Sequence, residues 1–262
     1  MKNLPARTLP ILLSALFLCA ISRPASADEP SHPQPANHIL FKDDFSGEKE
    51  EVWKEPKSVP GRWYVNSGTL HLRPGFGWTG DLSDPMENSQ VFRLLANPDK
   101  PLPKDYEVHF RIKVNRVCSE KPEDWHGVHV FLRYRDQFNL YYASIFRADG
   151  RIVIKKKLES RDHRAEGTEN GGYYYPLSPY TQISNPLGKP GWHNVAVGIQ
   201  GTPAEIWMKI DGQEVLRAKD SEKIGDPSLT AARPPLLIEE GTTGLRGDYT
   251  DFEFSSFEVV GL

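Results

Sequence analysis

The stretch HGVHVFLRYRDQFNLYYASIFRADGRIVIKKK, residues 126–157, decides the fold class of this chain. Apolar and polar side chains alternate along it with the period of a β-strand, and Ala148-Asp149-Gly150 is a turn signal between two of its runs. Similar short runs, each bounded by turn residues, continue from residue 39 onward, and convincing helical periodicity is absent. This pattern predicts an all-β protein, either a sandwich or a barrel.

The alternating runs predict the positions of the strands. We expect strands near residues 39–45, 62–66, 68–73, 89–94, 105–115, 126–135, 139–147, 151–158, 192–200, 204–210, 213–218, 243–247 and 251–260. The segment 159–191 contains several Pro and Gly residues and predicts a long loop, and loops of this length are usually functional or disordered.

The first residues have the pattern of an export signal. Lys2 and Arg7 precede an apolar run from Ile11 to Ile21, and Ala25-Ser26-Ala27 resembles a cleavage site. We expect a signal peptide over residues 1–27 that is cleaved near Ala27, so the mature protein would be secreted or periplasmic. Residues 28–38 predict a flexible leader, and 39–262 a single β-sandwich domain. No other apolar run is long enough to predict a transmembrane segment.

Charge is distributed unevenly along the mature chain. The whole chain has 32 Lys and Arg and 35 Asp and Glu; removing residues 1–27 takes away three basic residues, which leaves 29 − 35 = −6. Between His126 and Arg164, however, nine basic residues face four acidic ones, a local charge of +5. This asymmetry favours an anionic partner, which for an exported protein is an acidic polysaccharide or oligosaccharide and not nucleic acid. Only Cys118 remains after cleavage, so no internal disulfide is expected.

Several motifs resemble those of the concanavalin A-like (laminin G-like) jelly-roll superfamily. LFKDDFSG at 40–47, Trp53 and GRWYVNSGTLHL at 61–72 resemble its opening strands. PGWHNVAVGIQG at 190–201, IWMKIDGQEV at 206–215 and TGLRGDYTDFEFSSFEVV at 243–260 resemble its closing strands. The resemblance implies a two-sheet antiparallel β-sandwich with jelly-roll topology. It does not choose a function, because lectins, glucanases, polysaccharide lyases and inert modules share this fold.

Strand parity predicts a polar face within residues 126–158. Side chains alternate along each strand, and the mainly apolar sets are expected to turn toward the core. The residues then expected together on one exposed face are His129, Arg133, Tyr141, Lys155 and Lys157. The resemblance implies that such a face, the concave one, is the carbohydrate site. The alternative is a solvated sheet face whose Lys and Arg residues keep the protein soluble.

Lyase cleavage of a polyuronate is one reaction that these residue types would support. Arg133 would neutralise the carboxylate, His129 would take the proton at C5, and Tyr141 or Tyr142 would protonate the leaving oxygen. Jelly-roll polysaccharide lyases use similar residue types on the concave sheet, although the order and spacing here do not match. A glucanase is not expected, because the chain lacks the E-x-D-x-E run of jelly-roll glucanases.

Further binding residues are expected around the same face. The aromatic and basic candidates for contact with sugar are Tyr142, Lys155, Lys157, Trp78 and Tyr173. A structural calcium ion is also expected, because the first and last strands pair in this fold and would bring together Asp43, Asp44, Asp248 and Asp251. The alternative is that these aspartates are only turn or strand-edge residues. No other cofactor is expected.

Three functions remain open from the sequence. The first is a secreted carbohydrate-binding protein that recognises an acidic polysaccharide. The second is a polysaccharide lyase or related sugar-active hydrolase that uses the same face. The third is a structural or adhesion module without a sugar site.

Overall fold

The computed structural model describes residues 38–46, 53–54, 63–72, 91–96, 99–119, 121–136, 138–159, 172–220 and 238–262. Nearly all regular structure in these residues is β-strand, and a single turn of 3-10 helix, η1 (Pro186–Gly188), is the exception. All of the strand pairings are antiparallel. The all-β class predicted from the alternating runs is therefore confirmed.

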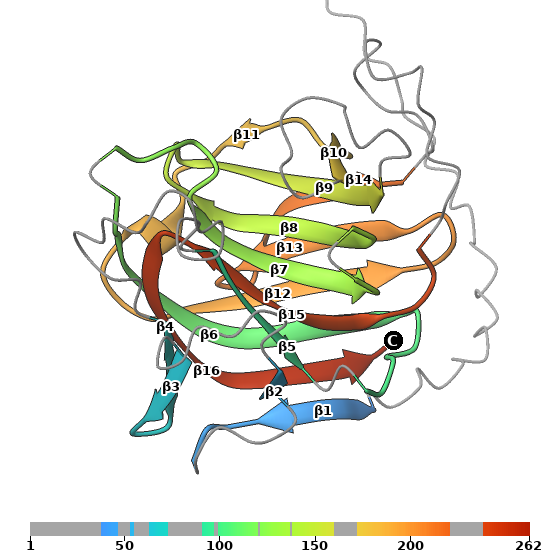
Figure 1. Ribbon diagram of the computed structural model, residues 1–262, viewed down its shortest axis with the longest axis horizontal. Helices are drawn as coiled ribbons and strands as arrows, with labels where there is room; N and C mark the ends of the chain where they lie inside the picture. Colours follow the sequence, from blue (N-terminus) through green and yellow to red (C-terminus); the bar gives the residue numbers. More distant parts are fainter. Residues whose placement is uncertain are drawn as a thin grey trace, which may run out of the picture. The chain divides into compact units, whose positions relative to one another are not determined.

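Eight strands form the first of two sheets, called sheet 1 here (Figure 1). In spatial order they are β14 (Gln213–Lys219), β13 (Glu205–Ile210), β12 (His193–Gln200), β6 (Tyr106–Val117), β16 (Thr250–Gly261), β4 (Thr69–Leu72) and β3 (Trp63–Asn66), and β1 (Ile39–Asp43) also pairs with β16. The last strand of the chain thus lies in the middle of sheet 1 and next to the first strand.

The other eight strands form sheet 2. In spatial order they are β10 (Gly172–Pro176), β9 (Arg151–Glu159), β8 (Leu140–Arg147), β7 (Gly127–Tyr134), β15 (Thr242–Asp248), β5 (Val91–Ala96) and β2 (Trp53–Lys54), and β11 (Thr181–Gln182) also pairs with β9. Residues 126–157 therefore supply three adjacent strands, β7, β8 and β9.

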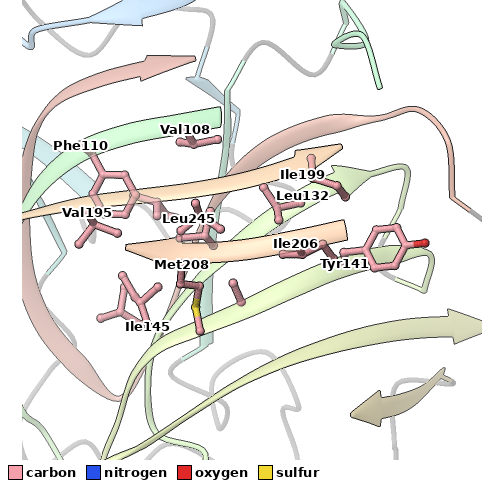
Figure 2. Packing of buried hydrophobic residues seen from close by; sticks show 14 of the residues in the cluster. Val108, Phe110, Leu132, Tyr141, Ile145, Val195, Ile199, Ile206, Met208 and Leu245 are labelled. Atoms are coloured by element: carbon pink, nitrogen blue, oxygen red, sulfur yellow. The ribbon is translucent and has the colours of Figure 1, made fainter. Parts of the chain in front are cut away.

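The hydrophobic core lies between the two sheets, as Figure 2 shows. Val108 and Phe110 of β6 come from sheet 1, whereas Leu132 of β7, Ile145 of β8 and Leu245 of β15 come from sheet 2. All five side chains are at most 3% exposed. A core enclosed by two antiparallel sheets is the arrangement of a β-sandwich, which decides between the sandwich and the barrel.

Two tight turns connect neighbouring strands of sheet 1. Ser67 (φ 51) and Gly68 (φ 72) join β3 to β4, and Asp211 (φ 50) and Gly212 (φ 79) join β13 to β14. Both central residues of each turn have positive φ, which is the backbone that two-residue hairpin loops require. Gly at the second position adopts it without steric cost.

All thirteen predicted strands are present, with bounds shifted by a few residues. The prediction of one long loop over 159–191 is wrong for the described part of that segment, because β10, β11 and η1 lie within it. Both strands add to β9, so hydrogen bonding to an existing edge organises a segment with little local strand pattern.

Two further predictions concern the signal peptide and the absence of a transmembrane segment. The signal peptide (1–27) and all but the last residue of the leader (28–38) lie outside the described residues. Where the chain is described, no helix combines the length and apolar character that crossing a membrane requires.

Candidate functional site

The side of sheet 2 that faces away from the core carries a cluster of its own. Val130 and Ala143 pack in the core, whereas their neighbours Phe131 and Tyr142 pack in a separate cluster with Leu95, Tyr134 and Leu140. Because successive side chains of a strand point to opposite sides, this second cluster marks the outer face of sheet 2.

Three of the predicted polar residues lie on this outer face. In β9, Ile152 and Ile154 belong to the core while Lys155 and Lys157 point outward, as the alternation predicts. His129 of β7 joins them, with its ring centroid 4.7 Å from that of Tyr142. The expectation that these side chains are exposed is wrong: His129 is 0%, Lys157 3% and Lys155 8% exposed.

Tyr141 does not lie on the outer face, and the predicted parity of β8 is wrong. Its ring packs in the core beside Ile206 of the opposite sheet (Figure 2). Its hydroxyl donates to Asp220 Oδ2 at 2.6 Å, and Lys156 Nζ donates to the same oxygen at 2.7 Å. All three side chains are buried, so Tyr141 belongs to a polar link between β8, β9 and the end of β14.

Arg133 is also displaced from the predicted face. Its backbone has φ 45, in the left-handed region, next to a register shift in the pairing of β7 with β15. The guanidinium donates to the carbonyl oxygens of Lys104, Gly201 and Ile238 at 2.7–3.0 Å. Because of this local change in strand geometry, the Arg133 guanidinium binds backbone carbonyls of three separate segments. It cannot form one site with His129 as predicted.

A hydrogen-bonded network runs across the outer face from β8 to β7 and β15. His129 Nδ1 lies 2.9 Å from Ser144 Oγ, and His129 Nε2 lies 3.1 Å from Asp248 Oδ2. Arg246 Nε donates to Asp248 Oδ1 at 2.7 Å, and an Arg246 amino group donates to the Tyr174 hydroxyl at 2.9 Å. Both ring nitrogens of His129 thus have hydrogen-bond partners. This favours a role for His129 in orienting Asp248 and, through it, Arg246.

Burial and charge shift the pKa values in this network. Burial lowers the pKa of His129 to about 4, so the ring is neutral at pH 7. Burial alone would raise the pKa of Asp248, but Arg246 and the His129 hydrogen bond lower it to about 2. Tyr174 behaves similarly, because Arg246 and Lys157 hold the pKa of its phenol below the ordinary value in spite of burial. The network therefore combines a carboxylate, a guanidinium and a phenol of increased acidity.

Lys155 of β9 lies on the outer face among aromatic rings. Its Nζ atom lies 5.7 Å from the ring centroids of Tyr142 and Tyr174 and 5.0 Å from that of Tyr180. No hydrogen bond or ion pair joins it to another described residue. Burial, with the added repulsion of Arg147 and Arg246, lowers the pKa of Lys155 to about 8. Cation–π contacts stabilise the ammonium, and the more distant Asp149 and Asp248 carboxylates also favour its charged form.

The arginines near Lys155 already have carboxylate partners. Arg147 is bound through two nitrogens by Asp149, at 2.7 and 3.1 Å, and Arg246 is bound by Asp248. Lys155 is therefore a buried positive charge for which the described residues supply no acceptor. An anion placed beside it would gain a charge-assisted hydrogen bond without displacing an existing ion pair.

The predicted calcium ligands lie in separate places. Asp43 accepts from Trp53 Nε1 at 2.6 Å, and Asp44 is an exposed turn residue. Asp248 belongs to the outer face, and Asp251 accepts from Asn115 at 2.8 Å on sheet 1. Strands β1 and β16 do pair, but Asp43 is opposite Phe257. Among the residues with assigned positions, no three His, Cys, Asp or Glu side chains form a metal site. The shared four-aspartate site is wrong, and calcium binding itself stays a prediction.

Two predicted sugar-binding residues have no described side chain. Trp78 lies outside the described residues, and Tyr173 is placed only by its backbone register, opposite Leu158 in β9. Sequence reasoning, in turn, missed Arg246, Ser144 and Tyr180. The spacing of Arg246 and Asp248 was a usable signal, because residues two apart on a strand share a face.

The comparisons with known proteins identify the fold. No protein-family model and no curated protein sequence matches the chain. Among solved structures, BuGH16Bwt is similar with a TM-score of 0.51 and 12% identity, covering 84% of this chain and 90% of that one. A mutant of the GH43 protein BlXynB from Bacillus licheniformis is similar with a TM-score of 0.50 and 14% identity, covering 89% of this chain and 41% of that one. The carbohydrate binding module CBM66 from Bacillus subtilis has a TM-score of 0.45 at 12% identity, covering 79% of this chain and 93% of that one.

The similarities to the first two structures, together with the two antiparallel sheets, show that the chain has a jelly-roll sandwich fold. The resemblance in the opening and closing strands is thereby confirmed. Identities of this order show only the fold, and function depends on the residues of the site.

Proposed function

We propose that this protein is an exported carbohydrate-binding jelly roll that recognises an acidic polysaccharide through the outer face of sheet 2. The observation that carries the proposal is Lys155, a buried ammonium that lies among three tyrosine rings and forms no ion pair with a carboxylate of the described residues. Export is inferred from the signal-peptide pattern of residues 1–27.

The chemistry of Lys155 favours an anionic ligand. A buried charge without a hydrogen-bonded partner is unfavourable, and an incoming carboxylate or sulfate oxygen would supply that partner. Hydrogen bonds to charged groups contribute about 1.5–3 kcal/mol, which is enough to separate acidic from neutral glycans by about ten- to a hundredfold.

The aromatic side chains favour a sugar as the carrier of that anion. Tyr180 is 40% exposed and lies next to Lys155, so its ring is available for stacking. Arg147 and Arg151 lie 5.1 and 5.5 Å from the same ring, which adds positive charge beside it. A flat, partly exposed ring surrounded by cations suits an acidic sugar residue, with its apolar face on the ring and its charge toward Lys155.

The proposal is tested by glycan binding measured with calorimetry. Polygalacturonate, alginate and chondroitin sulfate are compared with the neutral polymers laminarin and xylan. We expect binding to at least one acidic polymer, weakened at least about tenfold by Lys155→Met. Lys209→Met is the matched control, because Lys209 is a partly exposed lysine of sheet 1 paired with Glu107 at 3.3 Å.

Two results would contradict the proposal. One is equal binding of acidic and neutral polymers, and the other is unchanged affinity in Lys155→Met. If no polymer binds to the wild-type protein, the third alternative, a structural module without a sugar site, is favoured.

A polysaccharide lyase is the second candidate, and one observation favours it. The Tyr174 phenol is held by Arg246 at 2.9 Å and has a lowered pKa, which suits proton abstraction. In the reaction, Tyr174 would take the C5 proton of a uronate whose carboxylate is paired with Lys155. The C4–O bond would break, a C4=C5 double bond would form, and Tyr174 would pass the proton it took from C5 to the leaving oxygen.

The lyase is tested by following the ultraviolet absorbance of unsaturated uronate on each acidic polymer. Tyr174→Phe should abolish the signal while leaving binding in place. An absence of signal on every acidic polymer that binds would exclude this activity and leave binding as the function.

A further inference from the structure

Two exposed aromatic rings lie at the same end of sheet 2. Trp125 is 38% and Tyr180 40% exposed. Trp125 belongs to the turn that precedes β7, and Tyr180 precedes β11. Tyr and Trp are enriched at interfaces because each combines a flat apolar ring with a polar atom.

Polar contacts connect the two rings into one surface. The Ala148 amide donates to the His126 carbonyl at 2.8 Å, which places the turn before β7 beside the turn between β8 and β9. Arg151, the first residue of β9, forms an ion pair with Asp124 at 3.1 Å, and its guanidinium lies over the Tyr180 ring at 5.5 Å. We call the row Tyr180, Arg151, Asp124 and Trp125 the aromatic rim.

The Trp125 end of the rim is held in a fixed orientation. The Trp125 ring meets His126 edge to face at 4.4 Å, and His126 is stacked on Tyr249 at 4.2 Å. His126 Nδ1 accepts a hydrogen bond from the Glu123 amide at 3.1 Å, which fixes the histidine ring in turn. A ring fixed before binding loses little conformational entropy when a ligand stacks on it.

The other end of the rim touches the proposed anion site. Tyr180 is both a member of the rim and the exposed one of the three rings around Lys155. A ligand whose charged group meets Lys155 therefore has a path along the rim past Arg151 to Trp125.

From this geometry we infer that the site is extended and holds at least two sugar residues of an acidic glycan chain. One residue places its anionic group at Lys155 and its ring on Tyr180, and a residue further along the same chain stacks on Trp125. The Asp124–Arg151 ion pair lies between the two stacking positions. The inference rests on the proposed function, and it adds that chain length determines affinity.

The experiment uses oligomers of two, four and six residues, prepared from each acidic polymer that the wild-type protein binds. Affinity is measured by calorimetry for the wild-type protein, Trp125→Ala and Tyr180→Ala, and thermal melting checks that each variant is folded. Trp192→Ala is the matched control, because Trp192 is a partly exposed tryptophan next to β12 of sheet 1 with Arg111 over its ring at 5.4 Å.

We expect Trp125→Ala to weaken binding of the hexamer about tenfold and that of the dimer by less than about twofold. Tyr180→Ala should weaken all lengths, and Trp192→Ala none. Equal effects of Trp125→Ala on dimer and hexamer, or no effect on either, would overturn the extended site while leaving the proposed function intact. Binding to none of the acidic polymers by the wild-type protein would overturn both.

Discussion

Acid should destabilise this protein because His129 is buried in its neutral form. The His129 ring is 0% exposed, and burial lowers its pKa from 6.5 to about 4. A group whose pKa is lower in the folded state stabilises the fold fully only above its unfolded pKa, and this stabilisation is lost as the pH falls toward the folded pKa. The window for His129 therefore runs from about pH 6.5 down to about pH 4.

The size of the effect follows from the same two values. A difference of about 2.5 units corresponds to about 3 kcal/mol over the full window, since each unit is 1.36 kcal/mol. Between pH 7 and pH 4.5 the share from His129 is about 2 kcal/mol. Asp248 contributes little in this interval, because its pKa of about 2 and its ordinary value of 3.8 both lie below it.

Urea unfolding at pH 7 and pH 4.5 measures this effect. The wild-type protein should lose about 2 kcal/mol more stability between the two pH values than His129→Gln, which keeps polar atoms but does not titrate. The control is His109→Gln, because the His109 side chain is 47% exposed, and this variant should behave as the wild-type protein does. Equal losses in wild type and His129→Gln would refute the buried, neutral histidine.

Three other predictions concern the two faces of sheet 2 and the outer side of sheet 1. Because burial lowers the pKa of Lys155 to about 8, affinity for an acidic glycan should fall about tenfold per pH unit above pH 8. Lys155→Arg should remove that pH dependence, and a wild-type affinity that does not change with pH would contradict the prediction. Lys156→Met leaves the Asp220 carboxylate buried and should cost about 3–5 kcal/mol in urea unfolding, whereas a loss below about 1 kcal/mol would show the ion pair to be dispensable. A Cβ on Gly198 would lie 2.1 Å from the Trp207 ring, so Gly198→Ala should cost about 1–3 kcal/mol and change tryptophan fluorescence; an unchanged melting curve would disprove the close contact.

Strand parity was predictable from the sequence where only one side of a strand is apolar. In β9, Ile152 and Ile154 alternate with Lys155 and Lys157, so the alternation assigns the core side without ambiguity. The same reasoning fails for β8. There Tyr141 and Tyr142 are both buried on opposite sides, each among apolar neighbours, and the alternation carries no information about which side faces sheet 1.

The sequence could not predict which residues meet on the outer face, because the positions of Arg133 and Asp248 depend on distant segments of the chain. Arg133 was expected on the surface, as arginine usually is, but a left-handed backbone and three carbonyl acceptors from distant segments place it inside. Asp248 was assigned to a calcium site with Asp43, since the pairing of the first and last strands was known only in outline. Its actual partner, His129, lies 119 positions away, and only the register of β7 against β15 brings the two together.

The central place of β16 in sheet 1 has a consequence for how the chain acquires its structure. β16 lies between β6 and β4 and also binds β1, and its contact with β6 joins Asn115 to Asp251 across 136 positions. A growing polypeptide therefore cannot close this sheet until residues 250–261 have left the ribosome, and such long-range closure is slow.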